Sequence, residues 1–176
     1  MSDGLERVWL AVEVSSLWDA CREKHGSGSR INFEVLRNVI PSVRGGIGRV
    51  VLTASAYIVI HRRATHQSFS DVLTSLEYMV RTTEVSYTAT SYGPTSSPVA
   101  VHDDWTCGIS IDALHWMDEY DTFVLAAGHK QFEKLLTYLR NRGKNVVVMT
   151  FESPTTKSLY EEYADEVFYL TKDIIY

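Results

Sequence analysis

The sequence predicts an α/β domain in which an open, parallel β-sheet is covered by helices on both faces. Apolar runs of strand length alternate with segments of helical periodicity along nearly the whole chain. The apolar runs are rich in β-branched residues and lack polar alternation, which is typical of strands buried on both sides. A length of 176 residues fits one domain with one core. We therefore expect a single domain over residues 1–176, with its core at about residues 8–170.

The composition excludes several classes of protein. Hydrophobic residues make up 45% and charged residues 22%, so the chain is expected to fold rather than remain disordered. A net charge of -5 lacks the basic character of a non-specific nucleic-acid binder. Cys21 and Cys107 form no CxxC pair, which argues against a disulfide scaffold or structural zinc and favours the cytoplasm. We see no secretory signal and no bilayer-length apolar run, so no membrane partner is expected.

The first half of the chain is expected to hold two buried strands and three helices. Ser15 and Ser16 offer a cap for the first helix, and Asn32 offers one for the second. Ser68 and Asp71 resemble a capping box, followed by apolar residues at helical spacing as far as residue 80. We expect strands at residues 8–14 and 49–60 and helices at residues 17–25, 33–40 and 68–82.

The second half continues the alternation. Gly143 suits the C-terminal end of a helix, and Ser153 before Pro154 suits the start of another. Residues 84–92 alternate in the manner of a half-exposed strand. The remaining strands are expected at residues 122–127, 145–151 and 166–170, and helices at 104–119, 130–142 and from about 153 to 163.

An open parallel sheet places ligands at the carboxyl ends of its strands, where the strand order reverses. That rule selects residues 13–16, 127–131 and 151–153. Asp103, Asp104 and Asp112 precede the strand at residues 122–127 and can reach the same edge.

Three stretches in these regions have the order of a known family's motifs. The resemblance lies in the order of the stretches and in the residues that frame each motif. The signature strand-Asp-x-x-Asn matches residues 12–17, Lys-Gly-x-Asp with a further helical Asp matches residues 103–114, and Ser-Gly-Asp-x-Asp-Phe matches residues 125–132. These signatures are those of the NYN domains of the LabA-like group, a branch of the PIN-like nuclease superfamily. Residues 163–170 are similar to that family's ending. The resemblance implies a PIN-like, Rossmann-like three-layer fold.

The resemblance also implies a chemistry. Carboxylates in this family gather Mg²⁺ or Mn²⁺, which activates water for cleavage of an RNA phosphodiester. The matched positions hold Glu13 and Ser16 in the first motif, Thr106 and Asp112 in the second, and Ala127, His129 and Gln131 in the third. Glu13 and Asp112 therefore keep carboxylates, whereas the other matched acids are replaced. Because fewer close carboxylates need less positive charge to hold them, we expect weaker affinity for a divalent ion.

These substitutions lead to one leading hypothesis and two alternatives. The leading hypothesis is an RNA-associated binding or regulatory module, a degenerate nuclease with weak or no activity. In the first alternative, an active ribonuclease rebuilds its Mg²⁺ or Mn²⁺ site from Glu13, Asp112 and one of Asp103 or Asp104, with His129. In the second, the chain is a protein-interaction scaffold that does not bind RNA. A homodimer through an exposed edge strand is compatible with each hypothesis.

The candidate residues have both functional and structural interpretations. Catalytic roles are assigned to Glu13, Asp112 and His129, RNA binding to Ser16, Arg62, Arg63 and Lys130, and metal binding in an active enzyme to Glu13, Asp112 and Asp104. Glu13 can instead bond nearby backbone amides, and Asp112 can belong to a solvated helix face. His129 can simply occupy a loop, and the basic residues a solvated surface. Trp18 and Trp105 either stack a base or pack in the core.

Overall fold

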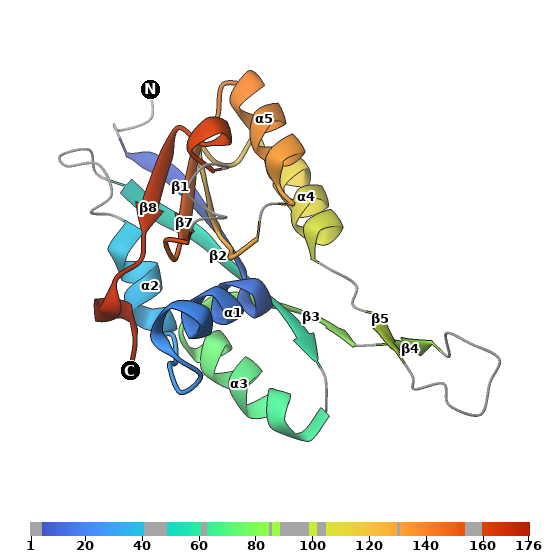
Figure 1. Cartoon of the computed structure of the whole chain (residues 1–176). Coiled ribbons are helices and arrows are strands. Elements are labelled where there is room, and N and C mark those ends of the chain that lie inside the picture. The colour runs from blue at the N-terminus through green and yellow to red at the C-terminus, as the bar shows by residue number, and fades with distance from the viewer. Residues whose placement is uncertain are drawn as a thin grey trace.

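The centre of the computed structural model is a six-stranded sheet in which all neighbouring strands are parallel (Figure 1). The structure describes residues 5–40, 49–60, 63–84, 86–88, 99–101, 105–129, 131–153 and 160–176. The strand order is β3-β2-β1-β6-β7-β8. The strands are β1 (Glu6–Glu13), β2 (Arg49–Ile60), β3 (Tyr78–Glu84), β6 (Thr122–Ala126), β7 (Asn145–Thr150) and β8 (Glu166–Tyr169).

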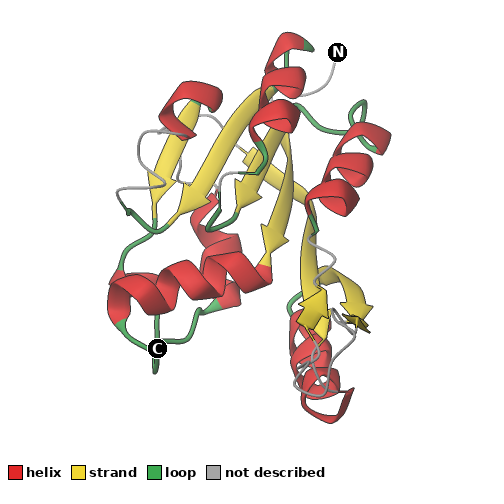
Figure 2. Ribbon diagram, turned by 45° about the vertical axis from the view of Figure 1, so that its right-hand side comes forward, coloured by secondary structure: helices red, strands yellow, loops and turns green. Residues whose placement is uncertain are grey.

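Helices cover both faces of the sheet, so the predicted fold class is confirmed (Figure 2). One face packs against α1 (Val14–His25), α2 (Phe33–Val39) and α3 (Arg63–Ser75). The opposite face packs against α4 (Thr106–His115) and α5 (Glu133–Asn141). Two short antiparallel strands, β4 (Ser86–Thr88) and β5 (Val99–Val101), form a separate ribbon, and a 3₁₀ turn, η2, covers Lys172–Ile174. None of the described helices is long and apolar enough to cross a membrane.

The strand order reverses between β1 and β6. The chain moves outward from β1 to β2 and β3, and it then returns to place β6 on the other side of β1. Val12 is paired with Ala126, so the carboxyl ends of β1 and β6 lie side by side. This is the position at which open α/β sheets bind ligands.

The predicted helix at residues 68–82 is wrong at both ends, because α3 begins at Arg63, so that Ser68 and Asp71 lie inside the helix and do not cap it. The helix α3 ends at Ser75, and Glu77 has a φ of 61°, which is incompatible with a continuing right-handed helix. The strand β3 then begins at Tyr78 and pairs with β2. The β-branched residues that follow favour an extended backbone over the helix that their spacing suggested. The strand predicted at residues 84–92 is therefore wrong at its start, and residues 85 and 89–92 lie outside the described residues.

Other boundaries differ by a few residues. The helix α1 begins at Val14, and its cap is Glu13 rather than Ser15 or Ser16. The helix α4 ends at His115 instead of residue 119. The Oδ1 atom of Asn32 accepts the N–H of Val35 at 3.1 Å, so the predicted cap of α2 is confirmed. Gly143 has the left-handed φ of 76° expected after a helix, whereas the predicted start at Pro154 lies outside the described residues.

Candidate functional site

Glu13 is a buried carboxylate at the end of the central strand β1. It is 3% exposed, and its side chain lies on the α4 and α5 face, like those of Ala11 and Trp9, which come two and four residues earlier. Its Oε2 atom accepts the backbone N–H of Ser16 at 2.8 Å, which caps α1. The same oxygen lies 3.6 Å from Nε2 of His129. The hydrogen bond from the start of α1 compensates for burial of the carboxylate.

Ser16 and Gly128 join the first turn of α1 to the segment after β6. The N–H of Gly128 donates to Oγ of Ser16 at 2.9 Å. A Cβ atom at residue 128 would lie 2.1 Å from the carbonyl oxygen of Ser16, so the two backbones approach this closely only with glycine at that position. The structure thus places Ser16, predicted to bind RNA, in a contact that positions the segment carrying His129.

His129 is held on two sides. Its ring stacks on Phe132, with centroids 5.2 Å apart and planes 5° from parallel. The hydroxyl of Tyr160 donates to its backbone oxygen. Burial raises the pKa of Tyr160, and the charge of Glu13 adds to that effect, so this hydroxyl remains a neutral donor. These contacts fix the imidazole beside Glu13.

Asp112 is engaged by two side chains from neighbouring strands. The hydroxyl of Tyr57, on β2, donates to its Oδ2 atom at 2.8 Å. Nε of Arg81, on β3, lies 3.3 Å from the same oxygen. Burial raises the pKa of Tyr57 well above its ordinary value, and the hydrogen bond to Asp112 adds to the rise. Tyr57 therefore stays protonated and donates a hydrogen bond to the carboxylate, and Arg81 supplies a nearby positive charge.

The register of the sheet brings these groups to one edge. Glu13 is paired with Tyr57, and Tyr57 is paired with Arg81. Paired residues of parallel strands project to the same face, so this row lies under α4, which carries Asp112. Sequence reasoning predicted that Glu13 and Asp112 approach the same edge, but it missed Tyr57 and Arg81. Tyr57 looked like one more residue of a buried strand, and Arg81 fell in the segment predicted as helix.

A neutral hydrogen bond occupies two positions at which the resemblance expects acids. Oγ1 of Thr106, at the start of α4, donates to Oε1 of Gln131 at 3.1 Å. Two carboxylates at this separation would repel each other unless a cation lay between them. The threonine and glutamine attract each other without one.

The described residues do not fit a magnesium or manganese centre. Among them, no group of three or more His, Cys, Asp or Glu side chains could hold a metal ion. Glu13 and Asp112 each face protein donors, and hard cations require several oxygen ligands. Asp103, Asp104, Arg62 and Lys130 lie outside the described residues, and for Arg63 the structure describes only the backbone in α3.

The two tryptophans for which base stacking and core packing were both considered have separate environments. Trp105 packs edge-on against Tyr57, with centroids 5.2 Å apart, beside the Glu13 and Asp112 edge. Trp18 lies on α1, on the opposite side of the sheet, and contacts Phe69. The two side chains therefore belong to different surfaces.

Comparisons with known proteins agree with this architecture. A family model described as NYN domain matches residues 13–171. The crystal structure of a protein of unknown function from Vibrio parahaemolyticus RIMD 2210633 is similar, with a TM-score of 0.77 and 21% sequence identity. The similarity covers 100% of this chain and 99% of that one, and at this identity it establishes the fold alone. Comparison with curated proteins gives no match.

Proposed function

Because the chain belongs to the NYN domain family, a nuclease-type fold, we propose that it is an RNA-binding module whose metal-dependent cleavage is weak or lost. The order of its three motifs further supports placing it in the LabA-like group. The observation that carries the proposal is the pairing of both remaining acids with protein groups. Asp112 faces Tyr57 and Arg81, and Glu13 faces the start of α1 and His129.

Charge compensation supports loss of the metal. A magnesium-dependent nuclease uses several close carboxylates whose repulsion is relieved by the ion. Here the Arg81 guanidinium lies beside Asp112, and Thr106 and Gln131 are neutral. An ion entering this edge would meet fewer anions and would compete with groups already in place.

The side chains at the carboxyl edge favour RNA binding without hydrolysis. The side chain of Arg81 is 42% exposed and that of His129 is 29% exposed, so both are accessible from the carboxyl edge. Guanidinium N–H groups donate to phosphate oxygens, whereas an uncompensated cluster of acids would repel the phosphate. The edge is therefore better suited to holding a phosphate than to activating water with an ion.

The proposal is tested by measuring binding and cleavage of the same RNA. We expect single-stranded RNA to bind equally well in EDTA and in Mg²⁺ or Mn²⁺, and to remain intact during incubation with the metal. Metal-dependent cleavage that disappears in Glu13→Gln and Asp112→Asn would support the active ribonuclease instead. Asp118→Asn, which removes an exposed acid after α4, is the control for a general loss of negative charge.

If the RNA binds neither in EDTA nor in Mg²⁺ or Mn²⁺, the proposal is also contradicted. The chain would then fit the protein-interaction scaffold. Measuring binding and cleavage on one RNA distinguishes all three functions.

A further inference from the structure

Two adjoining hollows form a groove between α1 and α3, on the side of the sheet opposite Asp112. One hollow, of about 320 Å³, reaches Val14 and Ser15 immediately after Glu13. The other, of about 440 Å³, extends past Arg30 to Tyr176. Trp18, Arg22 and Phe69 line both hollows, so the hollows lie next to each other. Figure 1 shows α1 and α3 next to each other below the sheet.

The floor of this groove, which we call the α1–α3 groove, is aromatic and fixed in place. The rings of Trp18 and Phe69 lie 5.7 Å apart, and Phe69 meets the buried Phe33 edge-on at 5.6 Å. Nε1 of Trp18 donates to the carbonyl oxygen of Ser29 at 3.4 Å, which orients the indole. Rings that are already ordered lose little conformational entropy when a ligand stacks on them.

The groove also carries positive charge, although the whole chain is acidic. The guanidinium of Arg22 lies 4.9 Å from the centroid of the Trp18 ring, and Arg22 and Arg30 are both exposed. Asp19 is the acidic side chain among the residues that line the two hollows. Aromatic rings beside arginines are the combination with which proteins bind single-stranded nucleic acid, because bases stack on rings and guanidinium planes while phosphates meet the charge.

We propose that the α1–α3 groove binds single-stranded RNA that passes over the Glu13 edge. Bases stack at Trp18 and Phe69 and on the guanidinium plane of Arg22, and Arg22 and Arg30 contact the phosphates. The path from Val14 to Arg22 follows α1 for about 12 Å, so the groove extends a strand beyond the acidic edge. This inference rests on the proposed RNA binding and adds the surface that takes the rest of the strand.

The test measures binding of a long and a short RNA to variants that remove either a positive or a negative charge from the groove. Fluorescence anisotropy in EDTA measures binding of single-stranded RNAs of roughly 12 and roughly 3 nucleotides. Each of Arg22→Gln and Arg30→Gln should weaken binding of the longer RNA about fivefold at about 0.1 M salt, and should lower the salt slope by roughly 0.7. Asp19→Asn should strengthen it. A fold defect would not move affinity in opposite directions.

A matched control lies on the other face of the sheet. Arg142, at the end of α5, lies 5.4 Å over the Tyr138 ring, so Arg142→Gln removes the same charge from the same kind of pair. We expect it to leave affinity for the longer RNA unchanged.

The outcomes separate this inference from the proposed function. Suppose that both RNAs bind the wild-type protein, and that none of Arg22→Gln, Arg30→Gln and Asp19→Asn changes the affinity for either RNA. The α1–α3 groove is then not the binding surface, while the proposed function stands. If neither RNA binds the wild-type protein, both are overturned. A weaker effect of the variants on the shorter RNA than on the longer one supports the path along the groove.

Discussion

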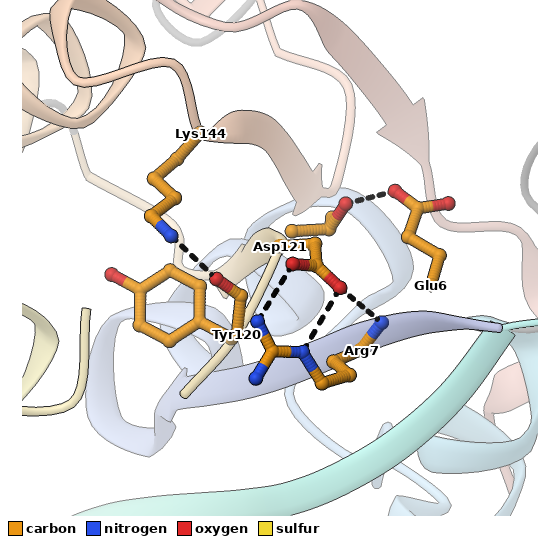
Figure 3. A network of polar contacts seen from close by, with 6 residues as sticks. Glu6, Arg7, Tyr120, Asp121 and Lys144 are labelled. Carbon is orange, nitrogen blue, oxygen red and sulfur yellow. Dashed lines mark hydrogen bonds and ion pairs between the residues drawn. The ribbon is translucent and has the colours of Figure 1, made fainter. Parts of the chain in front are cut away.

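The two edges of the sheet both carry acidic residues, but they use them differently. At the amino edge, where β1 and β6 begin, Asp121 accepts hydrogen bonds from the backbone N–H, Nε and Nη2 of Arg7 at 2.9, 3.1 and 2.9 Å (Figure 3). At the carboxyl edge, Arg81 approaches Asp112 to 3.3 Å without forming a hydrogen bond through Nε, and His129 lies 3.6 Å from Glu13. At the amino edge, hydrogen bonds within the protein hold Asp121 in place. At the carboxyl edge, Arg81 and His129 make longer contacts and can bind a ligand instead.

Neighbouring contacts reinforce the amino edge. Nζ of Lys144 donates to the carbonyl oxygen of Tyr120 at 2.8 Å (Figure 3). The hydroxyl of Thr122 donates to Glu6. Each of these residues lies within two residues of the start of a strand. Their polar groups are satisfied within the protein and hold the strands in register. The difference lies in how fully an arginine engages each acid and not in exposure, because the side chain of Asp121 is 45% exposed and that of Asp112 is 22% exposed.

The largest effect is expected from Gly128→Ala at the carboxyl edge. The new Cβ atom would lie 2.1 Å from the backbone oxygen of Ser16, so one of the two segments must move. We expect the free energy of unfolding to fall by about 3 kcal/mol, measured by urea denaturation. Gly28→Ala, where a Cβ atom meets nothing within 4 Å, is the matched control. Equal stability of the two variants would show that the close approach is not required.

Two tyrosine substitutions compare how much a single hydroxyl group near each edge contributes to the free energy of unfolding. Tyr120→Phe removes a hydrogen bond of 2.8 Å to the carbonyl oxygen of Ala113, which is 0% exposed and cannot turn to water. Tyr57→Phe removes the 2.8 Å bond to Asp112, whose side chain is 22% exposed and can be hydrated instead. Thermal unfolding should show a loss of about 2 kcal/mol for Tyr120→Phe and less than about 1 kcal/mol for Tyr57→Phe. The reverse order would mean that Tyr57 is the stronger structural contact.

A smaller, pH-dependent effect is expected at Asp121. The hydrogen bond from the Arg7 guanidinium holds the pKa of Asp121 below its usual range. Its stabilising contribution is therefore complete above the unfolded value of about 4 and is lost as the pH falls through the lower folded value. Because the site is partly solvated, Asp121→Asn should cost about 1 kcal/mol at neutral pH and progressively less in acid. A difference in stability that does not vary with pH would contradict this assignment.

The sequence predicted the inner strands well because their burial leaves a clear pattern. The strand at residues 49–60 has the predicted bounds, and the parallel sheet follows from the alternation of strands and helices. The error after Ser75 arose because apolar residues as far as Val80 also match helical spacing. A local pattern cannot report that β3 pairs with β2, and this pairing outweighed the spacing.

The sequence predicted the site residues that directly follow a strand. Glu13, Ser16 and His129 were expected at the adjoining ends of β1 and β6, and the structure brings them together. The row from Glu13 through Tyr57 to Arg81 depends on the register between separate strands, which a single sequence does not encode locally. The hydrogen-bond and ion-pair partners of Asp112 therefore became evident only in three dimensions.

The most direct test of the central claim is a metal titration followed by thermal unfolding. Wild-type protein is compared with a double variant, Thr106→Asp with Gln131→Asp, that restores acids at the two neutral positions. We expect Mg²⁺ and Mn²⁺ to leave the wild-type Tm unchanged, and to raise the Tm of the double variant after its two close carboxylates have lowered it in EDTA. A saturable rise in the wild-type Tm that is abolished by Glu13→Gln and by Asp112→Asn would contradict the account.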